Sequence, residues 1–157
     1  RCEVLMAAPR TWVTSELVTA SIMNAHVRDM FVALAASKSP AFSFGDPGGA
    51  VLTTGVKFIV PIRFGIRVSG WTLCSDQTGS IVLDLWRATY PTVPTVANTI
   101  TGTEKPTIAA SRVGQDLTLS SWTTDIPAGS LLAFNIDSCT SIKQGTLTLD
   151  GNLLDLL

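Results

Sequence analysis

The stretch from Val56 to Leu73 alternates between apolar and other residues, and this pattern constrains the fold more than any other feature. The even positions from 58 to 68 are all phenylalanine, valine or isoleucine, and among the odd positions between them only Ile59 is strongly apolar. After Ser69 the phase changes, and Trp71 and Leu73 continue the apolar face. Successive side chains of a β-strand point to opposite faces, so this period predicts strands with one buried face.

Further segments have the same strand character and are separated by turn-forming residues. They cover residues 50–55, 80–89, 116–126, 130–139 and 141–154, and the sequence predicts a turn at residues 76–79. Pro61 predicts either an edge position for its strand or a position at which its missing N–H faces away from the neighbouring strand, and Gly65 predicts a bend. Seven or eight short strands with turns between them predict an antiparallel β-sandwich, most consistent with a jelly roll, over residues 41–157. The predicted sandwich core consists of Trp71, Leu73, Ile81, Leu83, Trp86, Trp122 and Phe134.

Residues 1–40 predict a separate unit, made of an irregular arm followed by one α-helix. Thr19 is a suitable N-cap for a helix that runs from about residue 20 to residue 37. Its apolar residues follow the spacing of three and four that is typical of a coiled-coil seam. An amphipathic helix that packs on its own domain is the alternative interpretation. The residues predicted to anchor the chain or to form an oligomer interface are Trp12, Met23, Val27, Met30 and Leu34.

The charge content predicts that other chains cover part of the surface. Charged residues make up 15% of the chain and the mean hydropathy is +0.36, whereas roughly 25% charged residues are typical of soluble domains. A neutral surface rich in serine and threonine is the alternative. The net charge is −1, and Arg63 with Arg67 is the nearest approach to a basic cluster. We therefore expect no nucleic-acid partner, and without a run of 18 apolar residues we expect no membrane partner.

The residues that carry chemistry do not form a catalytic pattern. His26 is the single histidine and falls in the predicted helix, far in sequence from the strands. Asp84 and Asp137 are the nearest approach to the carboxylate pair of a glycosidase. The cysteines, three in number, lack the close spacing of zinc ligands. We therefore predict a protein that is not an enzyme and that uses no metal or other cofactor.

Three tryptophans offer a different hypothesis, a platform on which a sugar ring stacks. Trp71, Trp86 and Trp122 all fall in segments of strand character. Two of them have strongly apolar neighbours, which favours packing in the core over exposure on a binding surface.

Two sets of residues resemble the small structural virion proteins of tailed bacteriophages. The first set is an N-terminal pattern, Trp12-x3-Glu16-x2-Thr19-Ala20-x3-Asn24-x-His26-x-Arg28-Asp29. The second set lies in the strand region and consists of Trp71, Leu73, Asp76, Gly79, Ser80, Ile81, Asp84, Trp86, Trp122, Thr123, Ile126, Ala128 and Gly129. One departure is Ser15, where such proteins usually have glycine before the glutamate.

The resemblance implies a non-enzymatic subunit on the exterior of a virion, made in the host cytoplasm. It implies a homotrimer that decorates the capsid or forms a head fibre, with the arm and helix anchoring the β-domain. The alternative is a tail-fibre or tail-tip module that binds a receptor carbohydrate. The expected partners are copies of the chain, the major capsid protein or tail proteins, and a host-surface glycan as a further candidate.

Overall fold

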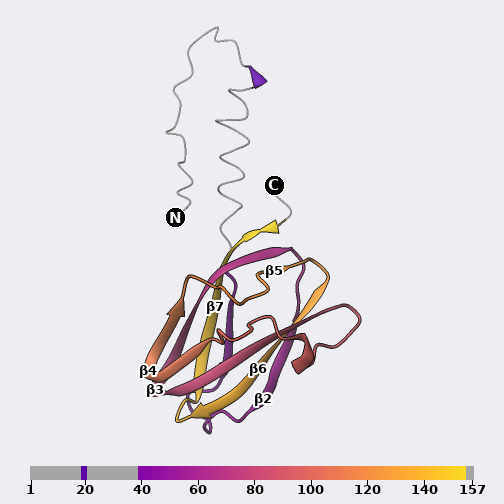
Figure 1. Cartoon of the computed structure of the whole chain (residues 1–157). Helices are drawn as coiled ribbons and strands as arrows, with labels where there is room; N and C mark the ends of the chain where they lie inside the picture. Colours follow the sequence, from indigo (N-terminus) through magenta and orange to yellow (C-terminus); the bar gives the residue numbers. More distant parts are fainter. Residues whose placement is uncertain (1–18, 21–38, 155–157) are drawn as a thin grey trace.

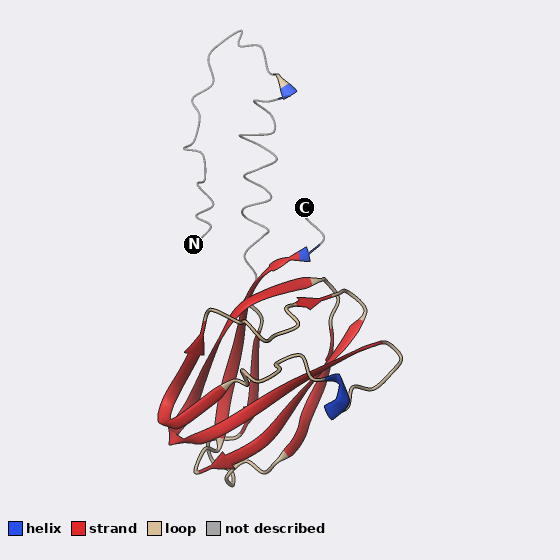
Figure 2. Ribbon diagram, viewed as in Figure 1, coloured by secondary structure: helices blue, strands red, loops and turns tan. Residues whose placement is uncertain are grey.

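The structure is a computed structural model of the chain, and it describes residues 19–20 and 39–154. Apart from Ala20, the predicted helix lies outside the described residues. Between residues 39 and 154 the protein is built from antiparallel strands, with the short 3₁₀-helix η2, a 3₁₀ conformation at Leu154 and no α-helix (Figure 2). The elements are β1 (Ala41–Gly45), β2 (Gly55–Pro61), β3 (Ile66–Thr89), η2 (Val96–Asn98), β4 (Thr107–Asp116), β5 (Asp125–Ile126), β6 (Ser130–Thr140) and β7 (Gln144–Leu153).

The strand β3 organises the sheet, because its 24 residues pair with four other strands. Its first part, residues 66–75, pairs with β7, and its second part, residues 80–89, pairs with β6. The chain from β6 through β7 therefore follows β3 backwards along nearly its whole length. On the other side of β3, β4 pairs with residues 71–82 and β5 with residues 66–67.

The strand β3 bends where its pairing changes from β7 to β6, and the connection between β6 and β7 lies at the same place. The sheet folds over there. We call this place, residues 76–79 and 141–143, the corner. The first wall contains β1, β7 and the start of β3, and the second wall contains β2, β6 and the end of β3. Bent strands that pass from one layer to the next make such corners in β-proteins. The result is one curled antiparallel sheet with the shape of a half-barrel (Figure 1).

The structure confirms the prediction that the fold is mainly β and that its strands are antiparallel. The hydrogen bonds form one continuous sheet rather than two separate ones, and the two layers face each other because that sheet is folded. Pro61 ends β2, which is an edge strand as predicted. The chain leaves the strand before Gly65, also as predicted.

The predicted turn at residues 76–79 is wrong, because β3 continues through it. The carboxylate of Asp76 accepts hydrogen bonds from the backbone amides of Lys143 and Gln144, at 3.1 and 3.0 Å. The side-chain amide of Gln77 donates to the carbonyl of Ser141. Gly79 lies so close to the opposite strand that a Cβ atom there would collide with a backbone carbonyl oxygen. Asp76 and Gln77, which indicate a turn in the sequence, therefore stabilise the corner in the structure through hydrogen bonds to residues 141–144.

The core lies between the two walls. Among the predicted core residues, Trp86 is half-buried, and the other six are buried: Trp71, Leu73, Ile81, Leu83, Trp122 and Phe134. Rings from both walls meet in the interior, where Phe134 of the second wall lies 4.5 Å from Phe42 of the first, between ring centroids. Phe58 of β2 stacks on Phe134 as well, with ring centroids 4.7 Å apart.

Candidate functional site

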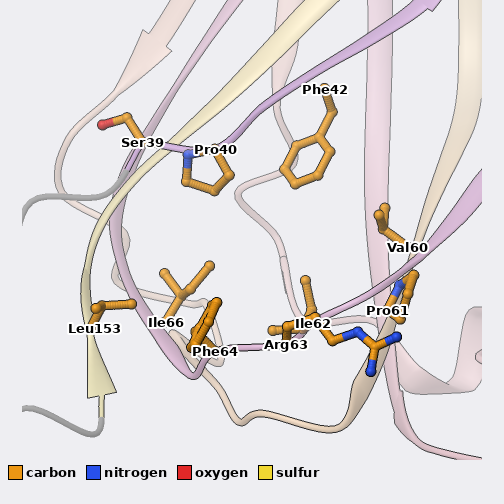
Figure 3. Close-up of a pocket in the computed structure, with 10 residues that line it drawn as sticks. All are labelled: Ser39, Pro40, Phe42, Val60, Pro61, Ile62, Arg63, Phe64, Ile66 and Leu153. Carbon is orange, nitrogen blue, oxygen red and sulfur yellow. The ribbon is translucent and has the colours of Figure 1, made fainter.

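The most distinctive surface feature is an apolar groove at the end of the half-barrel opposite the corner. The walls part there, at the start of β1 and β3 and at the end of β2 and β7 (Figure 3). The groove encloses about 610 Å³, within the range of roughly 300–1,000 Å³ that is usual for binding pockets. Its lining residues are Ser39, Pro40, Phe42, Val60, Pro61, Ile62, Arg63, Phe64, Ile66 and Leu153.

The segment between β2 and β3 forms one side of this groove, and backbone hydrogen bonds fix its position. Pro61 has no N–H, so β2 ends there. Ile62 then exchanges backbone hydrogen bonds with Ser130 and Gly129, both at 2.8 Å. Gly65 accepts a backbone hydrogen bond from Leu154 at 2.9 Å. This rigid loop buries the side chain of Ile62.

Phe64 lies in the same rigid loop, but its side chain is 72% exposed. The alternation in the sequence placed it on the buried face with Ile62 and Ile66. The alternation fails here because residues 62–65 are not part of a strand. A large aromatic side chain is therefore held at the rim of an apolar groove, in a position that covers no part of the core.

One charged side chain lines the groove. Arg63 is exposed, and within residues 39–154 it has neither an ion pair nor a hydrogen-bond partner. Arg67, a few residues further along, is different, because it forms a bidentate pair with Asp125 at 2.7 and 3.0 Å. The groove thus combines apolar walls with a single unpaired cation, a combination suited to an apolar ligand or segment that carries a negative charge.

The carboxylates Asp84 and Asp137, the one pair that had suggested glycosidase chemistry, share one lysine. The Nζ atom of Lys105 lies 3.1 Å from Asp84 and 2.6 Å from Asp137. Asp84 is 1% exposed and accepts hydrogen bonds from the hydroxyls of Thr99 and Thr101, at 2.6 and 2.7 Å. Both of its oxygens are therefore occupied by partners within the chain.

The pKa values of Asp84 and Lys105 follow from these contacts. Burial acts most strongly on Asp84 and favours a higher pKa, but the hydrogen bonds from Thr99, Thr101 and Lys105 together hold its pKa below the usual value. The pKa of Lys105 is raised, chiefly by its hydrogen bond to Asp137. A glycosidase acid needs a carboxyl with a raised pKa. The geometry indicates a structural ion cluster.

Trp71, Trp86 and Trp122 do not form an exposed platform, because none of the three is exposed. Trp71 and Trp122 are buried, and the indole N–H of Trp122 donates to the backbone carbonyl of Glu104 at 2.8 Å. The exposed aromatic residues of the described part are instead Phe64 and Tyr90, both 72% exposed. Tyr90 lines a second hollow beside the groove, together with Arg63 and residues of the turn before β6.

The predicted anchor residues Trp12, Met23, Val27, Met30 and Leu34, and the histidine His26, lie outside the described residues. Cys74 and Cys139 are both free thiols. Cys74 is exposed, whereas Cys139 is half-buried. Within the described residues, no three His, Cys, Asp or Glu side chains are grouped so as to hold a metal ion. No helix in this part of the chain has the length and apolar character to span a membrane.

Comparison with known proteins gives no relative from which to infer a function. No protein-family model, no curated protein and no solved structure matches the chain.

The groove is the site that the sequence did not predict. Its signal was present in the alternating stretch itself, where Pro61 and Gly65 lie only four residues apart. A strand that must end at Pro61 cannot keep Phe64 on its buried face. The short spacing between Pro61 and Gly65 indicates that Phe64 lies outside a strand, whereas the alternation alone places Phe64 on the buried face.

Proposed function

We propose that this protein is a non-enzymatic structural subunit on the exterior of a tailed-bacteriophage particle. In this proposal it forms a homotrimer that decorates the capsid or builds a head fibre. In this proposal the folded sheet corresponds to the jelly-roll-like sandwich domain of such proteins. Residues 1–40 anchor that domain to sister chains or to the shell.

The observation that carries the proposal is the apolar groove with its exposed phenylalanine. Phe64, Val60 and Pro61 present apolar surface at the end where the chain enters β1 from residues 1–38. Apolar surface that the chain does not bury itself is typical of contacts between subunits. The low charge content of the chain fits the same interpretation.

Two further observations support a structural role. The N-terminal pattern from Trp12 to Asp29 resembles that of small phage virion proteins. The only carboxylate pair that had suggested catalysis is engaged by Lys105 and by two threonine hydroxyls. Neither observation depends on the groove.

Sedimentation velocity of the full chain over a range of concentrations tests the proposal. We expect an oligomer, and we expect Met30→Asp to shift it toward smaller species because the substitution places a charge in the predicted seam. Asn24→Asp is the matched control, because it adds a charge to the same predicted helix outside the seam. A full-length chain that remains a monomer at all concentrations would contradict the proposal, and a cryo-EM map of the particle would locate the subunit.

A second candidate function, recognition of a host-surface glycan by a tail-fibre or tail-tip module, is favoured by one observation. Tyr90 is exposed beside the hollow that Arg63 also lines, and sugar rings stack on exposed aromatic faces. This candidate predicts that a host polysaccharide binds the wild-type chain and that Tyr90→Ala abolishes the binding. Equal binding by both chains, or none by either, counts against it.

A further inference from the structure

The groove raises the question of which apolar and negatively charged segment occupies it. We propose that the occupant is the segment Asp155-Leu156-Leu157 of a second copy of this chain. This inference rests on the proposed function, because it assumes that the chain forms an oligomer through this end of the half-barrel.

The position of the segment is the first argument. Residue 154 is held at the rim of the groove by the hydrogen bond from its backbone N–H to the carbonyl of Gly65, 2.9 Å long. Leu153, just before it, lines the groove. Residues 155–157 therefore begin at the site that they are proposed to fill, and in an assembly joined at this end every copy brings a groove and such a segment to the same place.

The chemistry of the segment is the second argument. Leu156 and Leu157 match the apolar side chains that line the groove, and Asp155 carries a charge opposite to that of Arg63. Arg63 has no partner within residues 39–154, whereas the nearby Arg67 is paired with Asp125. A leucine pair with one carboxylate satisfies the apolar walls and the unpaired cation together.

The direction of the chain favours a neighbouring copy over the same copy. The strand β7 runs toward the end of the half-barrel where the chain also enters β1 (Figure 1), and its last residue, Leu153, lines the groove. An extended chain advances roughly 3.5 Å per residue, so a chain that continued straight from residue 154 would be about 7 Å further along that direction after two residues. Residues 153–157 contain neither glycine nor proline, the residues that most readily reverse a chain directly after a fixed position.

Disulfide cross-linking between two differently tagged chains tests the inference. Both chains lack the native cysteines Cys2, Cys74 and Cys139, one carries Leu156→Cys, and the other carries Val60→Cys. When the two are co-expressed and oxidised, we expect a linked species that carries both tags. The control replaces Val60→Cys by Val113→Cys, an exposed position on β4 away from the groove, and should give only background linking.

A charge exchange gives an independent measurement. Arg63→Glu should weaken association about fivefold, the effect of a partly exposed ion pair, and adding Asp155→Lys should restore most of it. Replacing both Leu156 and Leu157 by serine should weaken association at least tenfold, because two apolar side chains lose their burial.

The outcomes separate the two proposals. A full chain that is oligomeric but gives no cross-tag disulfide overturns the inference and leaves the proposed function standing. A third chain carries both Leu156→Cys and Val60→Cys. A disulfide that forms within this chain, while the two singly substituted chains give no cross-tag link, overturns the inference in the same way, because the segment then fills its own groove. A full chain that stays monomeric overturns both.

Discussion

Two regions of the half-barrel differ in whether the chain provides partners for its own side chains. Around the connection between η2 and β4, the chain satisfies its own polar groups: Asp84 is bound by Lys105 and two threonine hydroxyls, and Glu104 by two serines. At the groove, the chain leaves Phe64 exposed and Arg63 unpaired within the described residues. The first region is complete within one chain, and the second is not. The difference indicates that the need for a partner is concentrated at one end of the molecule.

The largest effect is expected from breaking the complete region at its buried charge. Asp84→Ala removes a carboxylate that accepts two buried hydroxyl hydrogen bonds and holds Lys105. We expect a loss of about 3 kcal/mol in the free energy of unfolding, at the low end for a broken buried pair because Lys105 keeps Asp137. Urea unfolding measures this loss.

The control is Asp125→Ala, which breaks the exposed pair with Arg67. Exposed pairs contribute little, so the loss should stay below about 1 kcal/mol. Equal losses in the two variants would mean that Asp84 is no more important to the fold than a surface carboxylate.

The hydrogen bond of Trp122 provides a second, smaller test of the complete region. Trp122→Phe removes the donor to the carbonyl of Glu104 as well as some buried volume. Trp71→Phe is the matched control, because Trp71 is equally buried but its indole nitrogen has no hydrogen-bond partner within the described part. We expect Trp122→Phe to cost about 1 kcal/mol more unfolding free energy than Trp71→Phe, the usual net contribution of one hydrogen bond. Equal costs would show that the bond adds no stability.

Glu104 gives the complete region a dependence on pH. The hydrogen bond from the Ser120 hydroxyl and the backbone N–H of Ser121 are the main reasons that its pKa falls from 4.5 to about 2. A carboxylate with a lowered pKa stabilises the fold fully above pH 4.5, and this contribution is lost as the pH falls toward about 2. The melting temperature of Glu104→Gln should therefore fall less steeply than that of the wild type between these values.

Ser120→Ala refines the same measurement. Removing this hydroxyl takes away one donor and leaves the backbone amides in place, so the pKa of Glu104 should rise part of the way back. The melting temperature should then show a slope between those of the wild type and of Glu104→Gln. Three identical slopes would exclude Glu104 as the source of the acid sensitivity.

The sequence predicted those features of the fold that depend on local pattern. The alternation over residues 56–73 predicted strands, and its change of phase after Ser69 corresponds to the register shift between Val68 and Gly70 where β3 pairs with β7. Both are predictable because period two and its interruption are properties of a single strand. The edge position of Pro61 follows from its missing N–H in the same way.

The features that were missed depend on partners far away in the sequence. Residues 76–79 indicated a turn, but Asp76 is held by amides 67 and 68 residues further along the chain. The strand β4 was not predicted because only Ile108 is buried along its length, so it has no alternating face. The groove was missed for a related reason, since it is formed where four separate strands begin or end.

The smallest effect on stability, and the sharpest test of the comparison, is expected at the groove. Phe64→Ser removes a ring that covers no core, so the unfolding free energy should change by no more than about 0.5 kcal/mol. The same substitution should shift the sedimentation profile of the full chain toward smaller species, because apolar contact area between copies is lost. Val113→Ser, at a position 62% exposed on β4, is the control and should change neither quantity. If Phe64→Ser destabilises the fold as much as Asp84→Ala does, the groove belongs to the self-contained part of the molecule and the contrast between the two regions is wrong.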